Sequence, residues 1–166
     1  QGPRVQLLGS GSILNEVIAA ADLLKKDWGV EADIWSCPSF TLLARDGSDA
    51  ARWNLLHPSV TPRRSYVEQC LENTEGPVIA STDYVRAFAE QIRPYVPRRY
   101  TVLGTDGFGR SDTREKLRRF FEVDRHWVTV SGLAALAEEE KLDHARVAEA
   151  VKKYGLDPEK TNPLTV

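Results

Sequence analysis

Short apolar runs alternate with segments whose apolar residues recur every three or four positions, and this alternation restricts the possible folds most strongly. The runs have the length and composition of strands, and they lie at 5–8 (VQLL), 32–37 (ADIWSC), 78–80 (VIA) and 99–104 (RYTVLG). Strands that alternate with helices build a parallel sheet with right-handed crossovers and helices on both faces. The sequence therefore predicts a three-layer α/β fold with a mainly parallel sheet flanked by helices.

The predicted helices are marked by their apolar spacing and by residues that suit helix ends. The first begins near Ile13 and continues to the Trp28-Gly29 pair. The helix after the third strand can be capped by Thr82 or Asp83, whose side-chain oxygen would accept a first-turn N–H. The remaining helices are predicted at 113–123 (TREKLRRFFEV), from Trp127 onward, and at 143–155, with Asp143 as cap and Gly155 as stop.

The segment between the second and third strands has the least regular pattern. Pro38 closes the second strand, and residues 40–43 can hold one or two helical turns before the turn-like sequence RDGSD. Residues 51–62 (ARWNLLHPSVTP) contain two prolines among apolar residues. We expect them to form an irregular packed connection with a short helix.

Charge and composition exclude several classes of partner. The 22 Lys and Arg residues nearly balance the 24 Asp and Glu residues, and the net charge is -2 with no long run of either sign. Such a chain has no electrostatic footprint for nucleic acid or for an anionic membrane, so neither is an expected partner. No stretch approaches the roughly 20 apolar residues that a membrane-spanning helix requires. We therefore expect a cytoplasmic location.

Length and composition indicate one domain of a larger protein. With 166 residues, of which 42% are hydrophobic, the chain can bury the core of a single domain spanning 1–166. It contains no methionine and begins almost directly on a strand, so we expect it to be excised from a longer enzyme. Residues 1–3 are interpreted as a linker or a protease-cleavage remnant.

Two glycine-containing loops follow predicted strands, where related folds bind phosphate on a helix N-terminus. The first, GSGS at 9–12, lacks the third glycine of the dinucleotide motif, because Leu14 stands there. The second, GTDGFGRS at 104–111, has no lysine and the wrong spacing for a P-loop. We therefore interpret the first as a tight turn capped by Ser10 or Ser12, and the second as a shaped connection.

The titratable and nucleophilic residues form no catalytic or metal-binding motif. Cys37 and Cys70 lie 33 positions apart, and neither has a second cysteine or a histidine at ligand spacing. No nucleophile motif surrounds any of the three histidines, His57, His126 and His144. Asp112 and Glu115 are better explained as a capping box at a helix start. No catalytic, cofactor-binding or metal-ligating residue is predicted.

The loop at 103–115 (LGTDGFGRSDTRE) carries two residues that the fold does not explain. Tight or left-handed backbone turns would be permitted at its three glycines, Gly104, Gly107 and Gly109. Phe108 and Arg110 flank the last of these, which places an aromatic ring and a cation on a shaped loop. We expect this pair to face another domain or subunit.

Four longer stretches, taken in order, resemble one family. They are VQLLGSGSIL, ARDGSDAARWNLLHP, ASTDYVRAFAEQIRPYVP and VLGTDGFGRSDTREKLRRFFEVD, and the chain ends on LDPEKTNPLTV. Together they closely resemble the C-terminal domain of the homodimeric pyruvate dehydrogenase first component, a thiamine diphosphate-dependent enzyme of the bacterial pyruvate dehydrogenase complex. The resemblance covers residues 4–166 and implies a fold like that of the transketolase C-terminal domain.

The resemblance also implies the chemistry of the parent enzyme. That family decarboxylates pyruvate on thiamine diphosphate and reductively acetylates the lipoyl group of dihydrolipoyl acetyltransferase, with the cofactor as electron sink. The cofactor and its magnesium lie between two preceding domains of opposing subunits in a homodimer. The resemblance therefore implies that this domain binds neither thiamine diphosphate nor magnesium and is inactive alone.

Assembly is the role that the resemblance leaves to this domain: contact with the remaining domains of the enzyme, the second subunit and other components of the complex. Exposed aromatic and arginine side chains suit such surfaces. The candidate interface residues are Trp53, Phe108, Arg110, Arg118 and Arg119. For Trp53, a place in the domain's own core is an equal alternative. A regulatory module that binds an anion or nucleotide between the two glycine loops, at the carboxyl edge of the sheet, remains the alternative function.

Overall fold

Four parallel strands form the central sheet of the computed structural model, which describes residues 2–166. The strands are β1 (Arg4–Gly9), β2 (Glu31–Ser36), β3 (Val78–Ser81) and β4 (Tyr100–Leu103). Their order in the sheet is β2-β1-β3-β4. Leu7 of β1 lies between Ile34 of β2 and Ile79 of β3 in register. The predicted parallel sheet is confirmed.

The first described residues extend the sheet. The carbonyl oxygen of Pro3 accepts a hydrogen bond from the Glu31 N–H at 3.0 Å, so Pro3 pairs alongside β2. Gln1 lies outside the described residues, and for it the interpretation as linker or cleavage remnant remains a prediction.

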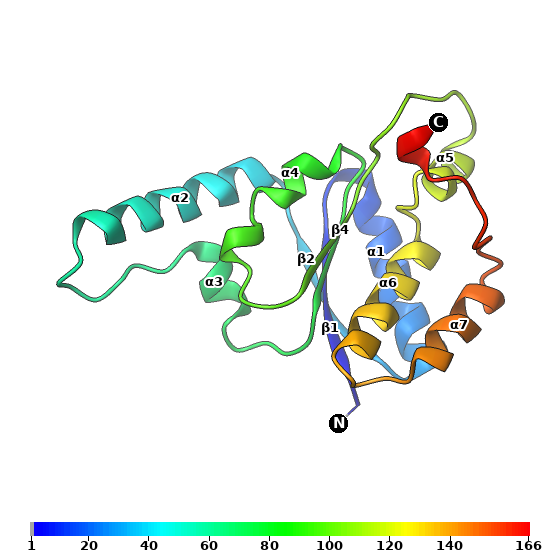
Figure 1. Ribbon diagram of the computed structural model, residues 1–166, viewed down its shortest axis with the longest axis horizontal. Helices are drawn as coiled ribbons and strands as arrows, with labels where there is room; N and C mark the ends of the chain where they lie inside the picture. Colours follow the sequence, from blue (N-terminus) through cyan, green and yellow to red (C-terminus); the bar gives the residue numbers. More distant parts are fainter. Residues whose placement is uncertain (1) are drawn as a thin grey trace.

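Helices cover both faces of the sheet and complete the predicted three-layer arrangement (Figure 1). On one face lie α1 (Leu14–Leu23), α5 (Arg114–Phe120), α6 (Arg125–Glu138) and α7 (His144–Lys153). On the other face lie α2 (Phe40–Leu56), α3 (Tyr66–Leu71) and α4 (Arg86–Glu90). Short turns of other helix types occur at Gly11–Ile13, Leu24–Trp28, Arg93–Tyr95 and Pro163–Thr165.

The two cores follow from the alternation of side chains along each strand. Leu7 and Ile79 point into the core under α1 and α6, whereas Leu8, Val78 and Ala80 point into the core under α3 and α4. These side chains are all buried, as expected of a parallel sheet that is covered on both faces.

A buried amide links β1 to its neighbours. Gln6 is fully buried, and its Nε2 donates to Asp33 Oδ2 at 2.7 Å and to the Glu75 carbonyl oxygen at 3.0 Å. Its Oε1 accepts from Trp35 Nε1 at 2.8 Å. The amide is therefore fully paired on both sides, which removes the cost of burying it and fixes Trp35 against the sheet.

The long helix α2 corrects the expectation for residues 40–62. The structure has one continuous helix of 17 residues where one or two turns and then an irregular connection were expected. Ser39 caps it by accepting the Leu42 N–H at 3.2 Å. Gly47, which made RDGSD look like a turn, is buried within the helix. A Cβ at this position would lie only 2.5 Å from the ring of Tyr95, so the close packing requires glycine.

The ends of the C-terminal helices agree in part with expectation. Asp143 caps α7 by accepting the Ala145 N–H at 2.8 Å, and Gly155 follows its end with φ of 60°, as predicted. The prediction of a capping box between Asp112 and Glu115 is wrong. Thr113 is the cap of α5, and Asp112 Oδ1 accepts the Thr113 N–H at 2.7 Å.

The caps predicted near the sheet's carboxyl edge are also wrong. The Ser10 side chain makes no cap bond; its hydroxyl donates to Thr82 Oγ1 at 2.8 Å. Neither Thr82 nor Asp83 caps α4, whose first N–H, that of Arg86, donates to the Asp106 carboxylate at 3.2 Å. A residue 20 positions along the chain supplies this cap, so local pattern could not reveal it.

We expect Gly47→Ala to destabilise the domain. Alanine favours a helix interior by roughly 1 kcal/mol over glycine, but overpacking against Tyr95 should cost about 1–3 kcal/mol. Urea unfolding followed by circular dichroism measures the net effect. In a Tyr95→Ala background the same substitution should become stabilising, because the space is then open. A stabilising Gly47→Ala in the wild-type background would contradict this account of α2.

Candidate functional site

The two glycine loops meet at the carboxyl edge of the sheet, as the alternative function requires, although β3 lies between the strands β1 and β4 that they follow. A pocket of about 470 Å³ lies between them, and Ser12, Gly107 and Gly109 contribute to its wall. Its charged lining is mixed: Arg110, Arg114 and Arg118 against Asp83 and Asp112. The edge therefore has the position of a ligand site in this class of fold, with three arginines and two aspartates in its lining.

The carboxylate of Asp83 lies beside the GSGS loop. A Cβ on Gly11 would lie 3.1 Å from Asp83 Oδ1, and the Ser12 hydroxyl donates to Asp83 Oδ2 at 3.4 Å. A phosphate placed on this loop would meet that negative charge at close range. The geometry therefore counts against nucleotide binding at the first loop.

The loop after β4 is fixed by contacts within the domain. Asp106 caps α4 and pairs with Arg86 Nε at 3.2 Å. Gly107 has φ of 108°, and a Cβ there would lie 2.3 Å from the Pro163 carbonyl oxygen, so both turn and packing demand glycine. Gly104 is needed for its close approach to Arg86. Gly109 has open surroundings and no positive φ, so the prediction of a special backbone conformation is wrong there.

Phe108 and Arg110 are both exposed on this loop, and Phe108 is 80% exposed. The Arg110 guanidinium lies 4.0 Å from the centre of the Phe120 ring. Arg110 therefore has a cation–π partner within the domain, whereas the Phe108 ring extends into solvent. That the pair faces another domain or subunit remains a prediction.

Arg118 joins three helices through one buried carboxylate. Its Nη1 lies 3.0 Å from Oε1 of Glu16 on α1, and the backbone N–H and Nε of Arg125 on α6 donate to Glu16 Oε2 at 2.9 and 3.1 Å. Burial works to raise the pKa of Glu16, but the hydrogen bonds and charge of Arg125, with the charge of Arg118, hold it below the ordinary 4.5.

Arg119 is also engaged within the domain. Its Nη2 donates to the carbonyl oxygens of Tyr154 and Gly155 at 2.6 and 2.9 Å, at the end of α7. Its Nη1 lies 3.0 Å from Nδ1 of His126. The two consecutive arginines therefore stabilise helix packing, and their guanidinium groups already have partners.

Across residues 2–166, no cluster of three or more His, Cys, Asp and Glu side chains could hold a metal ion without further ligands. The strand-end loop best placed for a diphosphate carries the carboxylate of Asp83 beside Gly11. That thiamine diphosphate and magnesium are bound by other domains remains a prediction. The described helices include none that is long and apolar enough to cross a membrane.

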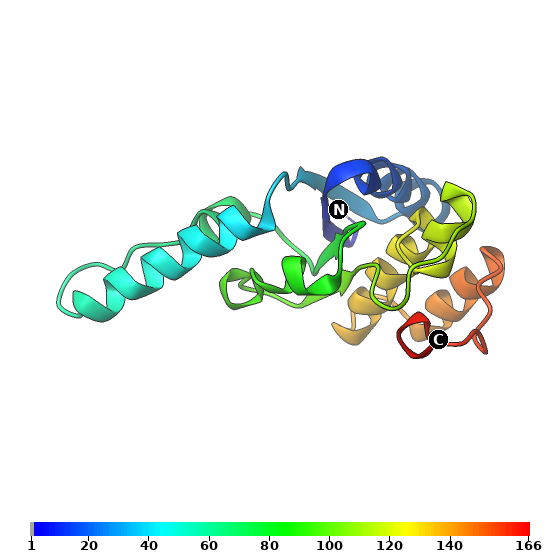
Figure 2. The same ribbon diagram turned by 90° about the horizontal axis from the view of Figure 1, so that it is seen from above.

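Helix α2 and the return segment to α3 project away from the rest of the domain (Figure 2). We call residues 40–66 the arm. Only Phe40 and Gly47 of α2 are buried. Large apolar side chains are exposed along its length: Leu42, Leu55, Leu56, Val60 and Tyr66. Such groups of exposed apolar residues are typical of interaction surfaces.

The end of the arm keeps its shape without a core. Asn54 Nδ2 donates to the Arg63 carbonyl oxygen at 2.9 Å, and its Oδ1 accepts the Arg63 N–H at 2.7 Å. The Trp53 ring stacks on His57 with 4.2 Å between centroids, and the Arg63 guanidinium lies 4.1 Å from its centre. Trp53 thus packs within the arm itself. It belongs to α2, whereas Arg118 and Arg119 belong to α5 on the other face of the sheet (Figure 1).

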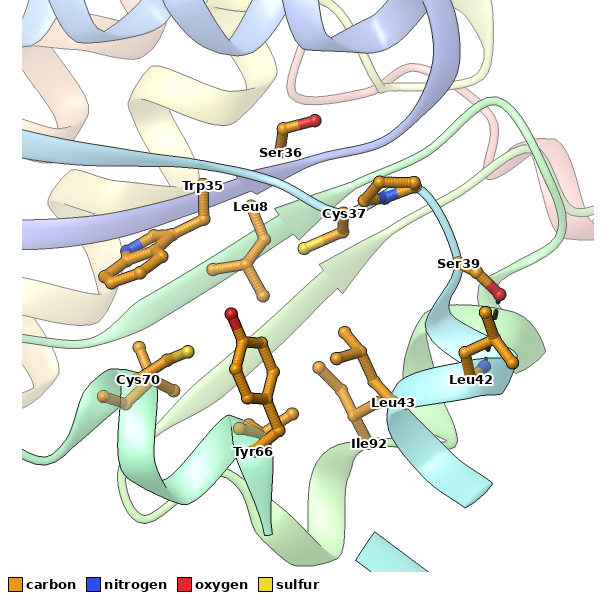
Figure 3. A pocket seen from close by; sticks show the side chains of 13 residues that line it. Leu8, Trp35, Ser36, Cys37, Ser39, Leu42, Leu43, Tyr66, Cys70 and Ile92 are labelled. Carbon is orange, nitrogen blue, oxygen red and sulfur yellow. Dashed lines mark hydrogen bonds between the residues drawn. The ribbon is translucent and has the colours of Figure 1, made fainter. Parts of the chain in front are cut away.

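An apolar pocket of about 340 Å³ lies at the base of the arm (Figure 3). Its walls come from β1, the end of β2, the helices α2 and α3, and the turn after α4. Among the lining residues are Leu8, Trp35, Leu43, Val67, Leu71 and Ile92. The sulfur atoms of Cys37 and Cys70 and the hydroxyl of Tyr66 point into the same space (Figure 3). Burial raises the pKa of the Cys37 thiol to about 12, so it is neutral at physiological pH.

Sequence reasoning missed both the arm and the pocket. A signal was present, because Pro38 and Pro58 bracket 19 residues without a proline and Ser39 is a good helix cap. The exposure of the apolar side chains depends on the direction in which α2 leaves the sheet, which no local pattern encodes.

A family model described as the transketolase-like TK C-terminal domain matches residues 1–124. A solved split-gene transketolase, described as an inactive beta4 tetramer, superimposes with a TM-score of 0.54 at 17% identity, over 82% of this chain and 40% of that one. At that identity the likeness shows the fold alone. The chain belongs to the transketolase-like C-terminal domain family.

Relatives in sequence narrow this assignment. The chain is 73% identical over 164 residues to the pyruvate dehydrogenase E1 component of Cupriavidus necator, and 62% and 55% identical over 161 residues to those of Pseudomonas aeruginosa and Escherichia coli K12. These matches cover 99%, 96% and 96% of this chain but 18% of each relative. The resemblance to the C-terminal domain of the pyruvate dehydrogenase first component is confirmed.

We expect Glu16→Gln to cost about 2–4 kcal/mol of unfolding free energy at pH 7, since it leaves Arg118 and Arg125 around a neutral group. The lowered pKa of Glu16 gives stability that is present above pH 4.5 and lost as the pH falls through the folded-state pKa. The difference between wild type and variant should therefore shrink at about pH 3. Urea unfolding at both pH values measures it, with the exposed Glu149→Gln as control. An equal difference at both pH values would contradict the ion-pair explanation.

Proposed function

We propose that this chain is the noncatalytic assembly domain, spanning 1–166, of a pyruvate dehydrogenase first component. The parent enzyme decarboxylates pyruvate with thiamine diphosphate and magnesium and reductively acetylates the lipoyl group of dihydrolipoyl acetyltransferase. It acts in the cytoplasm as a homodimer whose cofactor is bound by other domains. The identity to the three bacterial pyruvate dehydrogenase E1 components supports this parent activity.

The exposed apolar arm is the observation that carries the assembly role. A free surface offers no reason to expose Leu55 at 78% and Leu42 at 62%, because leaving such side chains in water forgoes the gain of burying them. Contact with the remaining domains of the enzyme would bury them. Trp53, Phe108, Arg110, Arg118 and Arg119 all remain proposed interface residues. The contacts of Arg118 and Arg119 within the domain would also stabilise it beneath the interface.

The domain alone should show no pyruvate decarboxylation when thiamine diphosphate and magnesium are added, because in the family that it resembles both lie between two other domains. Release of carbon dioxide from labelled pyruvate measures this, with the full-length enzyme as positive control. Turnover by the 166-residue chain would contradict the assignment of catalysis to other domains.

Calorimetry separates the assembly role from the regulatory alternative. Titration of the domain with phosphate, with nucleotides and with thiamine diphosphate should give no saturable heat, because Asp83 lies beside the GSGS loop and two of the three arginines in the pocket, Arg110 and Arg118, already have partners. Micromolar binding of a nucleotide would establish the regulatory module instead. Asp83→Asn is the matched variant, since it removes the charge that we expect to repel the anion.

Leu55→Asp should affect the full-length enzyme but not the isolated domain. Burying one leucine at an interface is worth about 1.5–3 kcal/mol, whereas a substitution on a free surface changes stability by about 0.5 kcal/mol or less. Urea unfolding of both proteins measures the two effects. Ile18→Asp, on the opposite face of the sheet and 43% exposed, is the control. Equal effects of Leu55→Asp on both proteins would contradict docking of the arm.

A further inference from the structure

The pocket at the base of the arm is built for an uncharged, apolar occupant. Among its lining residues there is no Lys, Arg, Asp, Glu or His. Its polar groups at the wall are serines, two thiols and one phenol, and the Cys37 thiol is held neutral by burial. A volume of about 340 Å³ is at the small end of the range of ligand pockets, roughly 300–1,000 Å³. One or two large apolar side chains would fill it.

The mouth of the pocket distinguishes between a small molecule and a macromolecule. Leu42 and Tyr66 stand at the mouth and are 62% and 59% exposed. A small molecule inside the pocket would leave their outer surfaces, and the more distant Leu55, Leu56 and Val60, in water. A protein surface would cover the pocket and the arm together, so the exposed apolar residues favour a protein partner.

The arm is arranged to present this surface without rearrangement. The Asp46 carboxylate accepts the Tyr66 N–H at 2.6 Å, which fixes the start of α3 against α2. Ser65 and Glu68 form a reciprocal capping box at 3.1 and 2.7 Å that holds the same turn. A surface that is already ordered loses little conformational entropy when a partner binds.

We infer that this pocket is an anchor site that receives a large apolar side chain from a domain of the same enzyme lying outside this chain. The inference rests on the proposed function. The relatives extend well beyond the match, since the chain spans 18% of each, so most of the enzyme is available to supply the anchor. The neutral pocket and its apolar rim accept a leucine-like or aromatic side chain and exclude a charged one.

Cys70 provides a reporter inside the pocket. Its thiol is partly exposed in the isolated domain, whereas Cys37 is buried and its raised pKa makes it slow to react. N-ethylmaleimide should modify Cys70 in the 166-residue chain about tenfold faster than in the full-length enzyme, where the anchor protects it. Mass spectrometry of the peptide that contains Cys70 measures both rates.

Leu42→Glu tests whether the protection comes from the docked surface. A glutamate at this position, three residues after Ser39, completes a capping box and so suits the first turn of α2. The variant should leave the isolated domain folded and should restore fast labelling of Cys70 in the full-length enzyme. Ile18→Glu, on the opposite face, should leave Cys70 protected.

Each contrary outcome identifies what is wrong. Equal labelling of Cys70 in both proteins overturns the anchor site, while the assembly role remains tested by Leu55→Asp. Protection that rises with the concentration of the 166-residue chain overturns the inferred partner and assigns the pocket to a second copy. If millimolar indole slows the labelling of Cys70 in the isolated domain, and Cys70 is not protected in the full-length enzyme, the pocket belongs to a small apolar molecule instead.

Discussion

The contact between Gly47 and the ring of Tyr95 determines where the arm lies. Beyond the buried Phe40 at its first turn, α2 has no other fully buried residue, so this packing sets the angle at which the helix leaves the sheet. Asp46, the neighbouring residue, then positions the start of α3 through the Tyr66 N–H. The pocket between α2, α3 and β2 therefore depends on the close approach of α2 to Tyr95, which is possible because Gly47 has no Cβ.

The carboxyl edge of the sheet has a different character. Folds of this class commonly bind ligands there, on glycine loops and helix N-termini. In this domain three carboxylates serve internal structure at that edge: Asp83 beside Gly11, Asp106 at the start of α4, and Glu16 between two arginines. Each uses donors that an anionic ligand would otherwise find. The architecture of a nucleotide fold is thus retained, while several of the donors at its usual site are already paired with the protein's own carboxylates.

The strands could be predicted because their information is local. The continuous burial of β1 after Arg4 and of all of β3 coincides with the apolar runs of the sequence, so the sheet and the layers could be predicted from local pattern. The arm could not be predicted, because Gly47 has the appearance of a turn residue until Tyr95, 48 positions later, is placed against it. Two further contacts could not be predicted for the same reason. They are the cap of α4 by Asp106 and the ion pair of Arg118 with Glu16, which lies 102 positions away in the sequence. Candidate interface residues chosen by type alone therefore included arginines that the fold already uses.

Weak anchors are sufficient for a domain that is tethered to its partner. A domain joined covalently to the rest of an enzyme is present at a high effective concentration, so docking loses little translational freedom. One side chain inserted into an apolar pocket contributes about 1.5–3 kcal/mol, which is a substantial fraction of the 5–15 kcal/mol that stabilises a typical domain. The arm offers such an anchor site at its base and several exposed apolar side chains along its length. A surface of this kind can hold the domain in one orientation without the large flat apolar face that independent subunits need.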